Sequence, residues 1–252
     1  MIMSFTVIIP SRYSSTRLPA KPLKDLAGMT MIERVYRQAC QSNASRVVIA
    51  TDDQRIFDVA TSFGAEVCMT RTDHESGTDR LQEAALNINL AEDEIVVNVQ
   101  GDEPLIPPAV INQVAENLAR NAQASMSTLS IAIQDVEEFY DPNCVKAVAD
   151  LDGMALYFSR SPIPFPRDGD SHSLPEVMTA QRHIGIYGYR VAFLNDFIQW
   201  PLSPLEDTEK LEQLRAMWQG CKIHIQTACE VPPPGIDTEA DLIRVRALLA
   251  DQ

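Results

Sequence analysis

The sequence predicts an α/β fold with a mixed, mainly parallel central sheet flanked by helices. In the first half of the chain, short β-branched runs alternate with segments of helical period. This order is typical of parallel strands covered by helices on both faces. The second half is mixed and contains a candidate hairpin turn at residues 150–153. No low-complexity linker or internal repeat interrupts the 252 residues, so we expect one continuous domain.

In the first half, strands are expected where β-branched residues cluster, and helices where apolar residues recur every three to four positions. Thr51, Asp52 and Asp53 can cap a following helix, and Gly64 suits its end. The pair Pro107 and Pro108 suits a first helical turn. In chain order we predict strand 5–9, helix 31–40, strand 47–50, helix 56–63, strand 65–69, helix 78–87, strand 95–100 and a helix from 107 to about 118.

The same criteria apply to the second half, where one segment has no clear period. Residues 161–182 are rich in Pro, Asp, Ser and Gly and are interpreted as a mobile surface loop. Around this segment we predict strands 126–133, 144–149, 155–158 and 184–190, helix 207–218, strand 222–227 and a final amphipathic helix 238–249.

Composition excludes several classes of function. The chain has 35 Asp and Glu against 21 Lys and Arg, a formal net charge of −14, which argues against binding nucleic acid or anionic membrane. No apolar run approaches the roughly 18–20 residues of a membrane span, and the start lacks a basic leader. Five cysteines form no CxxC pair, which fits a reducing compartment. We therefore predict a cytoplasmic protein without membrane insertion.

The loop after the first strand, residues 10–24, concentrates positive charge. It contains Arg12, Arg17, Lys21 and Lys24, and residues 1–24 include no Asp or Glu. Guanidinium and ammonium groups, together with hydroxyls and loop amides, are the donors that a polyphosphate needs. A solvated basic loop is the alternative. The position at the carboxyl end of a strand, where open α/β sheets bind ligands, favours a phosphate site.

Two carboxylates are candidates for a metal site. Asp102 directly follows a predicted buried strand, and Gly101 before it leaves the approach open. Asp237 precedes the last helix. Mg²⁺ prefers carboxylate oxygens and keeps phosphates and waters as further ligands. Either aspartate could instead cap the helix that follows it, and for Asp237 the spacing alone favours that alternative.

A third candidate is the segment 76–80, Ser-Gly-Thr-Asp-Arg, at a predicted helix start. Its small residues and backbone amides suit close approach to a base or ribose, and a Ser/Thr helix cap is the alternative. The glycines form neither GxGxxG nor GxxxxGK[ST], which disfavours dinucleotide-dependent and P-loop proteins. No GxSxG elbow or HExxH motif occurs either.

Taken together in order, these motifs resemble those of the sugar-acid cytidylyltransferases, a Rossmann-like, glycosyltransferase-A-like nucleotidyltransferase family. The resemblance covers nearly the whole chain. It is carried by residues 11–23, 50–52, 76–80, 98–104, 156–160, 183–187, 211–215 and 237–238.

The resemblance implies that CMP is transferred from CTP to the eight-carbon sugar acid 3-deoxy-D-manno-octulosonate (Kdo). Pyrophosphate would be released, Mg²⁺ would be the cofactor, and the product would feed lipopolysaccharide synthesis. It also implies a homodimer, with 1–125 mainly the CTP-binding half and 126–252 mainly the sugar-binding and dimerisation half.

The implied CTP-binding residues are Ser11, Arg12, Arg17, Lys21, Ser76, Gly77, Thr78 and Arg80. Lys21, Asp102 and Asp237 are implied as catalytic, the two aspartates as metal ligands. Those implied around the sugar acid are Gln100, Arg160, His183, Tyr187, Glu212 and Gln213.

The chain departs from the family pattern at a few positions. Ala20 stands where the family usually has Gly, and Gly28-Met29-Thr30 where it usually has Gly-Lys-Pro. If position 20 needs a positive φ, alanine there costs about 1 kcal/mol. Three readings stay open from the sequence: a Kdo enzyme, an enzyme for an amino-substituted Kdo or another sugar acid, and a non-catalytic nucleotide-binding relative.

Overall fold

The structure is a computed structural model that describes residues 4–14, 17–74, 76–167, 173–176 and 178–250. Its strands in chain order are β1 (Phe5–Ser11), β2 (Asp25–Leu26), β3 (Met29–Thr30), β4 (Arg46–Thr51), β5 (Glu66–Met69), β6 (Ile95–Asn98), β7 (Met126–Ala132), β8 (Lys146–Ala149), β9 (Ala155–Ser159), β10 (Gln181–Arg190) and β11 (Ile223–Thr227). Its helices are the short 3₁₀ helix η1 (Lys21–Leu23) and α1 (Met31–Ala39), α2 (Gln54–Ser62), α3 (Gly77–Asn87), α4 (Pro108–Arg120), α5 (Val136–Tyr140), α6 (Val191–Phe197), α7 (Pro204–Glu209), α8 (Gln213–Trp218) and α9 (Glu239–Ala250).

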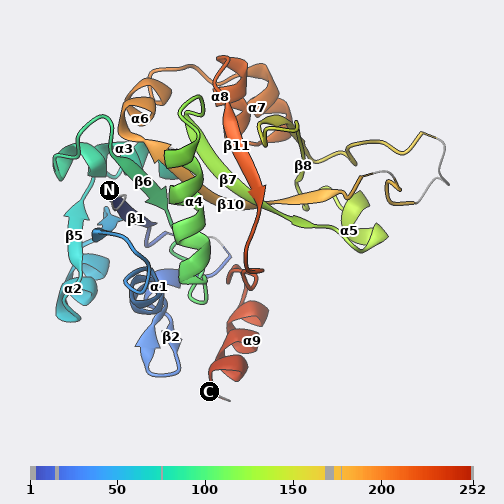
Figure 1. Ribbon diagram of the computed structural model, residues 1–252. Coiled ribbons are helices and arrows are strands. Elements are labelled where there is room, and N and C mark those ends of the chain that lie inside the picture. The colour runs from blue at the N-terminus through green and yellow to red at the C-terminus, as the bar shows by residue number, and fades with distance from the viewer. Residues whose placement is uncertain (1–3, 15–16, 75, 168–172, 177, 251–252) are drawn as a thin grey trace.

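One large sheet organises the molecule (Figure 1). Within the described residues it has nine strands, with the path β11-β7-β10-β6-β1-β4-β5 and with β8 and β9 extending from β10. The pairs β6-β1, β1-β4, β4-β5 and β7-β11 are parallel, and only β10 on this path runs against its neighbours. The predicted fold class, α/β with a mixed, mainly parallel sheet flanked by helices, is therefore confirmed.

Helices cover both faces of the sheet, and successive apolar side chains of β1 point to opposite faces. Val7 and Ile9 point into a core shared with α1, α2 and α4. Ile8, between them, points into a second core shared with α3, α6 and α8. Because both faces are covered, the strands consist of continuous β-branched runs instead of alternating polar and apolar residues.

The predicted helix 207–218 is wrong, because the segment forms two short helices. The chain leaves α7 at Lys210, whose φ of 53° is left-handed, and α8 begins only at Gln213. A left-handed residue ends a helix, and it is usually glycine or asparagine, so a lysine there gives no warning in the sequence. Helices α5 and α6 and the β2-β3 hairpin were also absent from the prediction.

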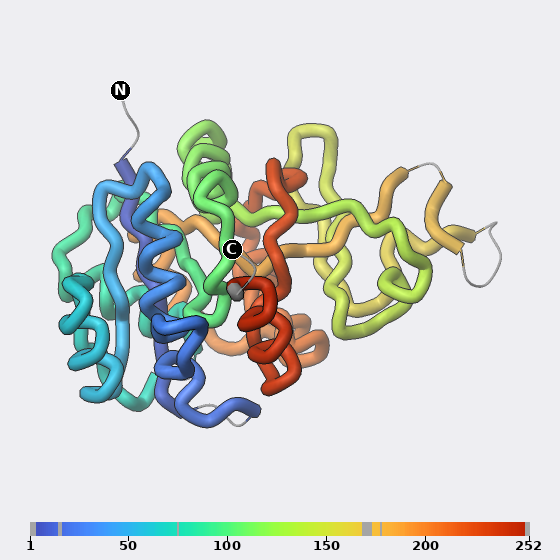
Figure 2. Tube along the Cα trace, turned by 90° about the horizontal axis from the view of Figure 1, so that it is seen from below, coloured from blue at the N-terminus to red at the C-terminus, as the bar shows by residue number. Residues whose placement is uncertain are grey.

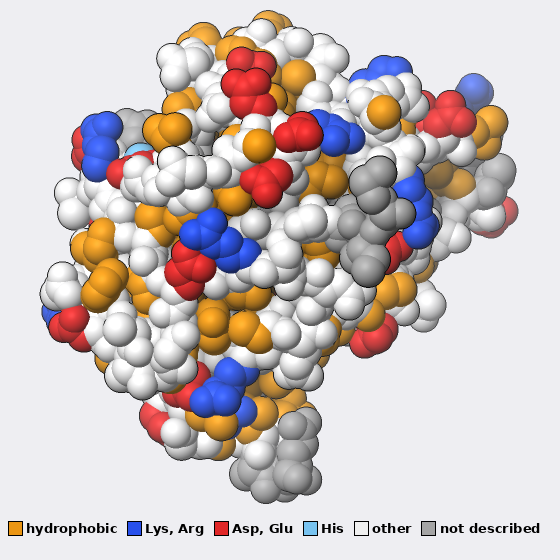
Figure 3. Space-filling view, turned by 60° about the vertical axis from the view of Figure 1, so that its left-hand side comes forward, with side chains coloured by type: hydrophobic (Ala, Val, Ile, Leu, Met, Phe, Trp, Pro, Cys, Tyr) orange, Lys and Arg blue, Asp and Glu red, His pale blue; other side chains and the backbone are white. Residues whose placement is uncertain are grey.

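Other boundaries agree closely with the prediction. In the segment expected to be a loop, the described residues between 161 and 180 form neither helix nor strand, and β10 begins at Gln181. Residues 168–172 and 177 of that segment lie outside the described residues. No helix in the described part of the chain is long and apolar enough to cross a membrane. The face drawn in Figure 3 carries interspersed acidic and basic side chains instead of a continuous basic surface.

Ala20 adopts the left-handed backbone conformation. Its φ is 55° and its ψ 31°, immediately before η1. A Cβ in this region approaches the carbonyl oxygen too closely, so the residue is strained by about 1 kcal/mol relative to glycine. Position 20 therefore does need a positive φ, so alanine in place of the family's usual glycine lowers the stability of the folded chain.

The second feature that bears on stability is a buried lysine. The Lys146 side chain has no exposed surface, and its Nζ donates to the backbone oxygens of Asp141 at 2.8 Å, Cys144 at 2.5 Å and Arg160 at 2.7 Å. Burial lowers the pKa of Lys146. The ammonium joins the loop after α5 to the end of β9, because it donates to backbone oxygens of both segments.

We predict that Lys146→Met destabilises the protein by about 3 kcal/mol, since it leaves buried carbonyls without a donor. The measurement is the free energy of unfolding in urea. The matched control is Lys222→Met, which removes an exposed lysine that donates only to Gln123 and should change stability by less than about 0.5 kcal/mol. Equal effects of the two substitutions would contradict the structural role of Lys146.

We predict that Ala20→Gly stabilises the protein by about 0.5–1 kcal/mol, because glycine relieves the left-handed strain and loses only part of the gain to chain entropy. The same substitution at Ala119, exposed within α4, should destabilise by up to about 1 kcal/mol. Thermal unfolding of both variants tests the opposite signs.

Candidate active site

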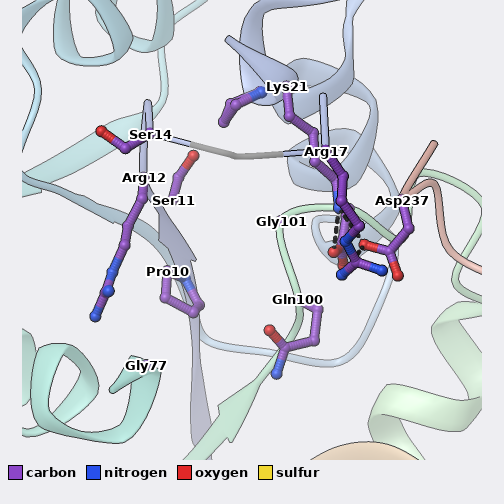
Figure 4. Close-up of a pocket in the computed structure, with 12 residues that line it drawn as sticks. Pro10, Ser11, Arg12, Ser14, Arg17, Lys21, Gly77, Gln100, Gly101 and Asp237 are labelled. Carbon is purple, nitrogen blue, oxygen red and sulfur yellow. Dashed lines mark hydrogen bonds and ion pairs between the residues drawn. The ribbon is translucent and has the colours of Figure 1, made fainter. Parts of the chain in front are cut away.

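A pocket of about 410 Å³ opens at the carboxyl ends of β1 and β6 (Figure 4). The loops after these two strands form most of it, and the start of α3 and the segment before α9 complete it. This is the sheet edge where the sequence predicts ligand binding. Its lining residues are Pro10, Ser11, Arg12, Ser14, Arg17, Lys21, Pro22, Gly77, Gln100, Gly101, Asp102 and Asp237.

At one side of the pocket, two carboxylates meet one ammonium group. Lys21 Nζ lies 2.6 Å from Asp102 Oδ2 and 2.9 Å from Asp237 Oδ1, and its side chain is 12% exposed. Arg17 Nη2 lies 3.1 Å from the same oxygen of Asp237. Figure 4 shows Arg17, Lys21 and Asp237 converging on this point. Residues 216 positions apart in the sequence therefore form one charged cluster.

Close backbone contacts position these carboxylates. A Cβ added at Gly101 would lie 2.9 Å from the carbonyl oxygen of Pro10, so only glycine lets the loop after β6 pack this tightly on the end of β1. The N–H of Ile236 donates to the backbone oxygen of Asp102 at 2.9 Å. This bond joins the segment before Asp237 directly to the residue that carries the other carboxylate.

Neither aspartate is a helix cap. The residue before α4 is Pro107, which makes no side-chain cap. For α9 the cap is Thr238, whose Oγ1 accepts from Asp241 N at 3.2 Å. Both carboxylates are thus left facing the pocket, which contradicts the capping alternatives considered for them.

Ser76 does cap α3, so that alternative holds for this residue. Its side chain accepts from Asp79 N, and the Asp79 side chain accepts from Ser76 N in return. The carbonyls of His74 and Ser76 each accept a hydrogen bond of 2.9 Å from Arg12 Nη2. Gly77 follows in the pocket wall, so the N-terminus of an 11-residue helix, favourable for anions, faces the cavity.

Two residues expected in the CTP site lie behind the pocket. Thr78 is buried, and its Oγ1 donates to Glu212 Oε2 at 2.8 Å. Arg80 has no exposed surface; its guanidinium contacts Thr70 Oγ1 and lies 2.7 Å from Asp52 Oδ2. The structure does not bring Arg80 to the cavity. Arg80 instead holds α3 against the ends of β4 and β5.

Of the residues expected around the sugar acid, only Gln100 lines the pocket. His183 and Tyr187 lie on β10 with their ring centroids 5.3 Å apart, and Thr128 Oγ1 is 2.9 Å from His183 Nε2. Burial lowers the pKa of His183 to about 3 and raises that of Tyr187, so both are neutral near pH 7.

Glu212 and Gln213 stand at the start of α8. Burial raises the pKa of Glu212, and hydrogen bonds from Thr78 and Ser76 oppose that shift. Glu212 Oε1 and Gln213 Nε2 are buried and have no hydrogen-bond partner among the described residues. Buried polar atoms are normally satisfied, so these two are available to a ligand.

Arg160 is held by the backbone around it. Its Nε donates to Glu209 O at 2.6 Å and its Nη1 to Pro142 O at 2.9 Å, while its own N–H donates to Glu209 Oε2 at 2.9 Å. Arg160 does not line the cavity described above. Glu209 and Lys146, which support Arg160, were not predicted, because their roles depend on contacts between distant segments.

The donor set suits a hard divalent cation that also binds a ligand. Asp102 and Asp237 offer only oxygens, and both already approach one cationic nitrogen. Among the described residues, no group of three or more His, Cys, Asp or Glu is arranged to hold a metal ion. A magnesium ion here would therefore need phosphate or water oxygens to complete its coordination, which is its usual preference.

The basic first loop and Asp102 were predicted from the residues themselves, whereas Asp237 was favoured as a helix cap and entered the site only through the family resemblance. Pro10 and Ser14, which also line the cavity, belong to the predicted loop 10–24 but were not predicted as site residues. Ser15 and Thr16 of that loop lie outside the described residues. The contribution of Ile236 and Asp241 was missed, because a buried isoleucine and a helical aspartate look ordinary in sequence.

Comparison with known proteins places this geometry in a family. A model of the cytidylyltransferase family matches residues 6–223. The 3-deoxy-manno-octulosonate cytidylyltransferase of Cellvibrio japonicus is 61% identical over 98% of both chains, and that of Pseudomonas syringae pv. syringae is 56% identical over 99% of both. A solved structure of a CMP:2-keto-3-deoxy-manno-octonic acid synthetase complexed with CTP is 41% identical over 99% of both chains, with a TM-score of 0.90.

These similarities extend over almost the full length of the chain and agree with the basic loop, the glycine-positioned Asp102 and the sheet topology found above. The chain belongs to the cytidylyltransferase family.

Proposed function

We propose that this protein transfers CMP from CTP to 3-deoxy-D-manno-octulosonate, giving CMP-Kdo and pyrophosphate. The observation that carries the proposal is the meeting of Asp102, Asp237 and Lys21 beside the basic loop, at the ligand-binding edge of the sheet. The names of its close full-length relatives support the choice of sugar acid.

In this mechanism the first loop binds the triphosphate. Arg17 and Lys21 lie in the cavity wall as donors for phosphate oxygens, and Arg12 stands beside the amino end of α3, where Gly77 leaves the backbone accessible. The anomeric hydroxyl of the sugar acid loses its proton to solvent and its oxygen attacks the α-phosphorus, while the bond from that phosphorus to the bridging oxygen breaks and pyrophosphate leaves. Positioning and charge neutralisation supply most of the rate in such a transfer.

Asp102 and Asp237 are proposed to hold Mg²⁺. When bound, the ion would neutralise phosphate charge and lower the pKa of the attacking hydroxyl. The two carboxylates lie close enough to share one cation, since both contact Lys21 Nζ. Lys21 would then be free to turn from the carboxylates to a phosphate oxygen within the same cavity.

The sugar acid is proposed to bind between Gln100 and β10. Neutral His183 and Tyr187 would offer hydrogen bonds to hydroxyl groups, and Glu212 and Gln213 carry buried atoms still without partners. Arg160 keeps guanidinium hydrogens beyond those it donates to backbone oxygens, and these suit the sugar carboxylate. Arg80 is proposed to act on CTP indirectly, through α3.

The further implications of the family resemblance remain proposals. They are a homodimer, a division into a CTP-binding half, 1–125, and a sugar-binding and dimerisation half, 126–252, a cytoplasmic location and a product used in lipopolysaccharide synthesis. Strands of both halves form one continuous sheet, since β10 of the second half pairs with β6 of the first, so any such division concerns the ligands and not separately folded bodies.

Pyrophosphate release from CTP and Mg²⁺ tests the activity directly. Kdo should support turnover, and its 8-amino analogue and sialic acid should be poorer substrates. Preference for either analogue would reassign the sugar acid. Binding of CTP by calorimetry without turnover of any sugar acid would identify a non-catalytic relative.

We predict that Asp102→Asn lowers pyrophosphate release at least about 100-fold, because an amide cannot replace the charge of the carboxylate on a divalent cation. Circular dichroism and thermal unfolding should show a folded protein. The control Asp58→Asn changes an exposed aspartate of α2 and should retain full activity. Full activity of the Asp102 variant would exclude it as the metal ligand.

We also predict that His183 makes the stability of the protein depend on pH in the acid range. The pKa of His183 is about 3 in the folded protein and near 6.5 when unfolded, so below pH 6.5 the unfolded state binds a proton that the folded state does not. The contribution of His183 to stability is thus complete above pH 6.5 and decreases as the pH falls. Between about pH 6 and 5, the unfolding free energy of the wild type should fall more steeply than that of His183→Gln, by about 1 kcal/mol per pH unit. Parallel pH dependences would show that His183 titrates normally.

A further inference from the structure

The segment that supplies Asp237 is held in place by a small core of its own. Buried Leu18 from the first loop, Leu26 from β2 and Met31 from the start of α1 pack against buried Ile236, Leu242 and Val245. Figures 1 and 2 both show α9 beside the β2 region, outside the layers that cover the main sheet. The matched family model ends at residue 223, so Asp237 and α9 lie beyond the matched residues.

The side chain of Asp241, in the first turn of α9, fixes the backbone of Asp237. Asp241 Oδ2 accepts from Asp237 N at 3.2 Å, from Thr238 N at 3.0 Å and from Thr238 Oγ1 at 2.8 Å. Thr238 Oγ1 in return accepts from Asp241 N. Thr238 and Asp241 thus form a reciprocal capping box, and one additional hydrogen bond joins Asp241 to the residue before the cap, Asp237. These hydrogen bonds lower the pKa of Asp241.

The helix is anchored at its other end to the loop it faces. Arg246 Nε and Nη2 donate to the backbone oxygen of Asp25 at 3.0 and 2.8 Å. Ile236 N donates to Asp102 O, and Gly235 passes so close to that oxygen that an added Cβ would lie 3.3 Å from it. Asp237 is therefore held between two fixed points, the Asp102 backbone and the first turn of α9.

We propose that α9 is a positioning element of the active site and that Asp241 is the residue through which it aims the Asp237 carboxylate. Asp241 contacts neither the pocket nor the other carboxylate, so it acts only through Asp237. The inference rests on the proposed function, because the consequence of losing this alignment is weaker binding of Mg²⁺ with CTP. Residues that orient metal ligands typically change metal affinity or activity by about 10- to 100-fold when removed.

The test is Asp241→Ala, which removes the hydrogen bond to Asp237 N, with Thr238→Val as a second variant that removes only the two bonds of Thr238 Oγ1 and so holds Asp241 less firmly. For Asp241→Ala, the half-saturating Mg²⁺ concentration and the calorimetric Kd for CTP in the presence of Mg²⁺ should each rise about tenfold, and for Thr238→Val about threefold. The KM for Kdo should stay within about twofold, because the acceptor side of the site is built on β10 and α8. Asp241→Glu should restore both values, since glutamate is the usual partner of a threonine cap at this spacing.

Two controls separate alignment from general stability. Ile243→Ala changes a side chain on the exposed face of α9, 61% exposed. Arg244→Ala removes only the ion pair to Asp241 Oδ1, which lies outside the capping box. Both should keep wild-type Mg²⁺ dependence. Thermal unfolding of every variant identifies any that fail to fold, and Thr238→Val then decides.

The outcomes are distinguishable. An inactive wild type with every sugar acid would remove the proposed function. An active wild type, together with folded Asp241 and Thr238 variants of unchanged Mg²⁺ and CTP affinity, would overturn the positioning role alone. An equal rise in the KM for Kdo and in the Mg²⁺ requirement would also overturn it, because that pattern indicates general loosening of the fold.

Discussion

The candidate active site depends on two carboxylates held around one cationic side chain. Asp102 and Asp237 would repel each other if they stood alone, and Lys21, which is largely buried, removes that repulsion by contacting both. Each of the three residues comes from a different part of the chain: the loop after β1, the loop after β6 and the segment before α9. Their convergence requires a tight contact at Gly101, a backbone hydrogen bond from Ile236 and a separate apolar core beneath.

A second group of residues, Thr78 and Glu212, lies behind the cationic side of the pocket. Thr78 at the start of α3 donates to Glu212 at the start of α8, so the two helices that approach the ligand edge are joined by one hydrogen bond. The Glu212 carboxyl accepts from Thr78, and its Oε1 has no hydrogen-bond partner among the described residues. The proposed binding regions for nucleotide and sugar acid are thus physically continuous, although they come from opposite halves of the sequence.

Most of the fold could be predicted because its main strands are buried on both faces and so contain uninterrupted β-branched runs. The basic loop was predictable for a similar reason: its charge contrasts with an acidic chain. Prediction failed where tertiary contacts decide. Lys210 ends α7 without a glycine, and Arg80, adjacent to a recognisable motif, is drawn into a buried ion pair with Asp52. Spacing alone favoured Asp237 as a cap, and only the contacts of Thr238 and Asp241 show that the cap is the next residue.

Three buried polar atoms without a partner among the described residues offer hydrogen-bonding groups to the proposed sugar acid. A buried donor or acceptor without a partner costs about 1–3 kcal/mol, and within the part of the chain that the structure describes Ser11, Glu212 and Gln213 each carry one. A ligand that satisfies them recovers this free energy on binding. Because Glu212 accepts from Thr78 through its other oxygen, a hydroxyl bound at Oε1 would also stabilise the start of α3, where the nucleotide is proposed to bind. Binding of the acceptor would then favour the conformation that binds the donor, a coupling that follows from a single shared carboxyl group.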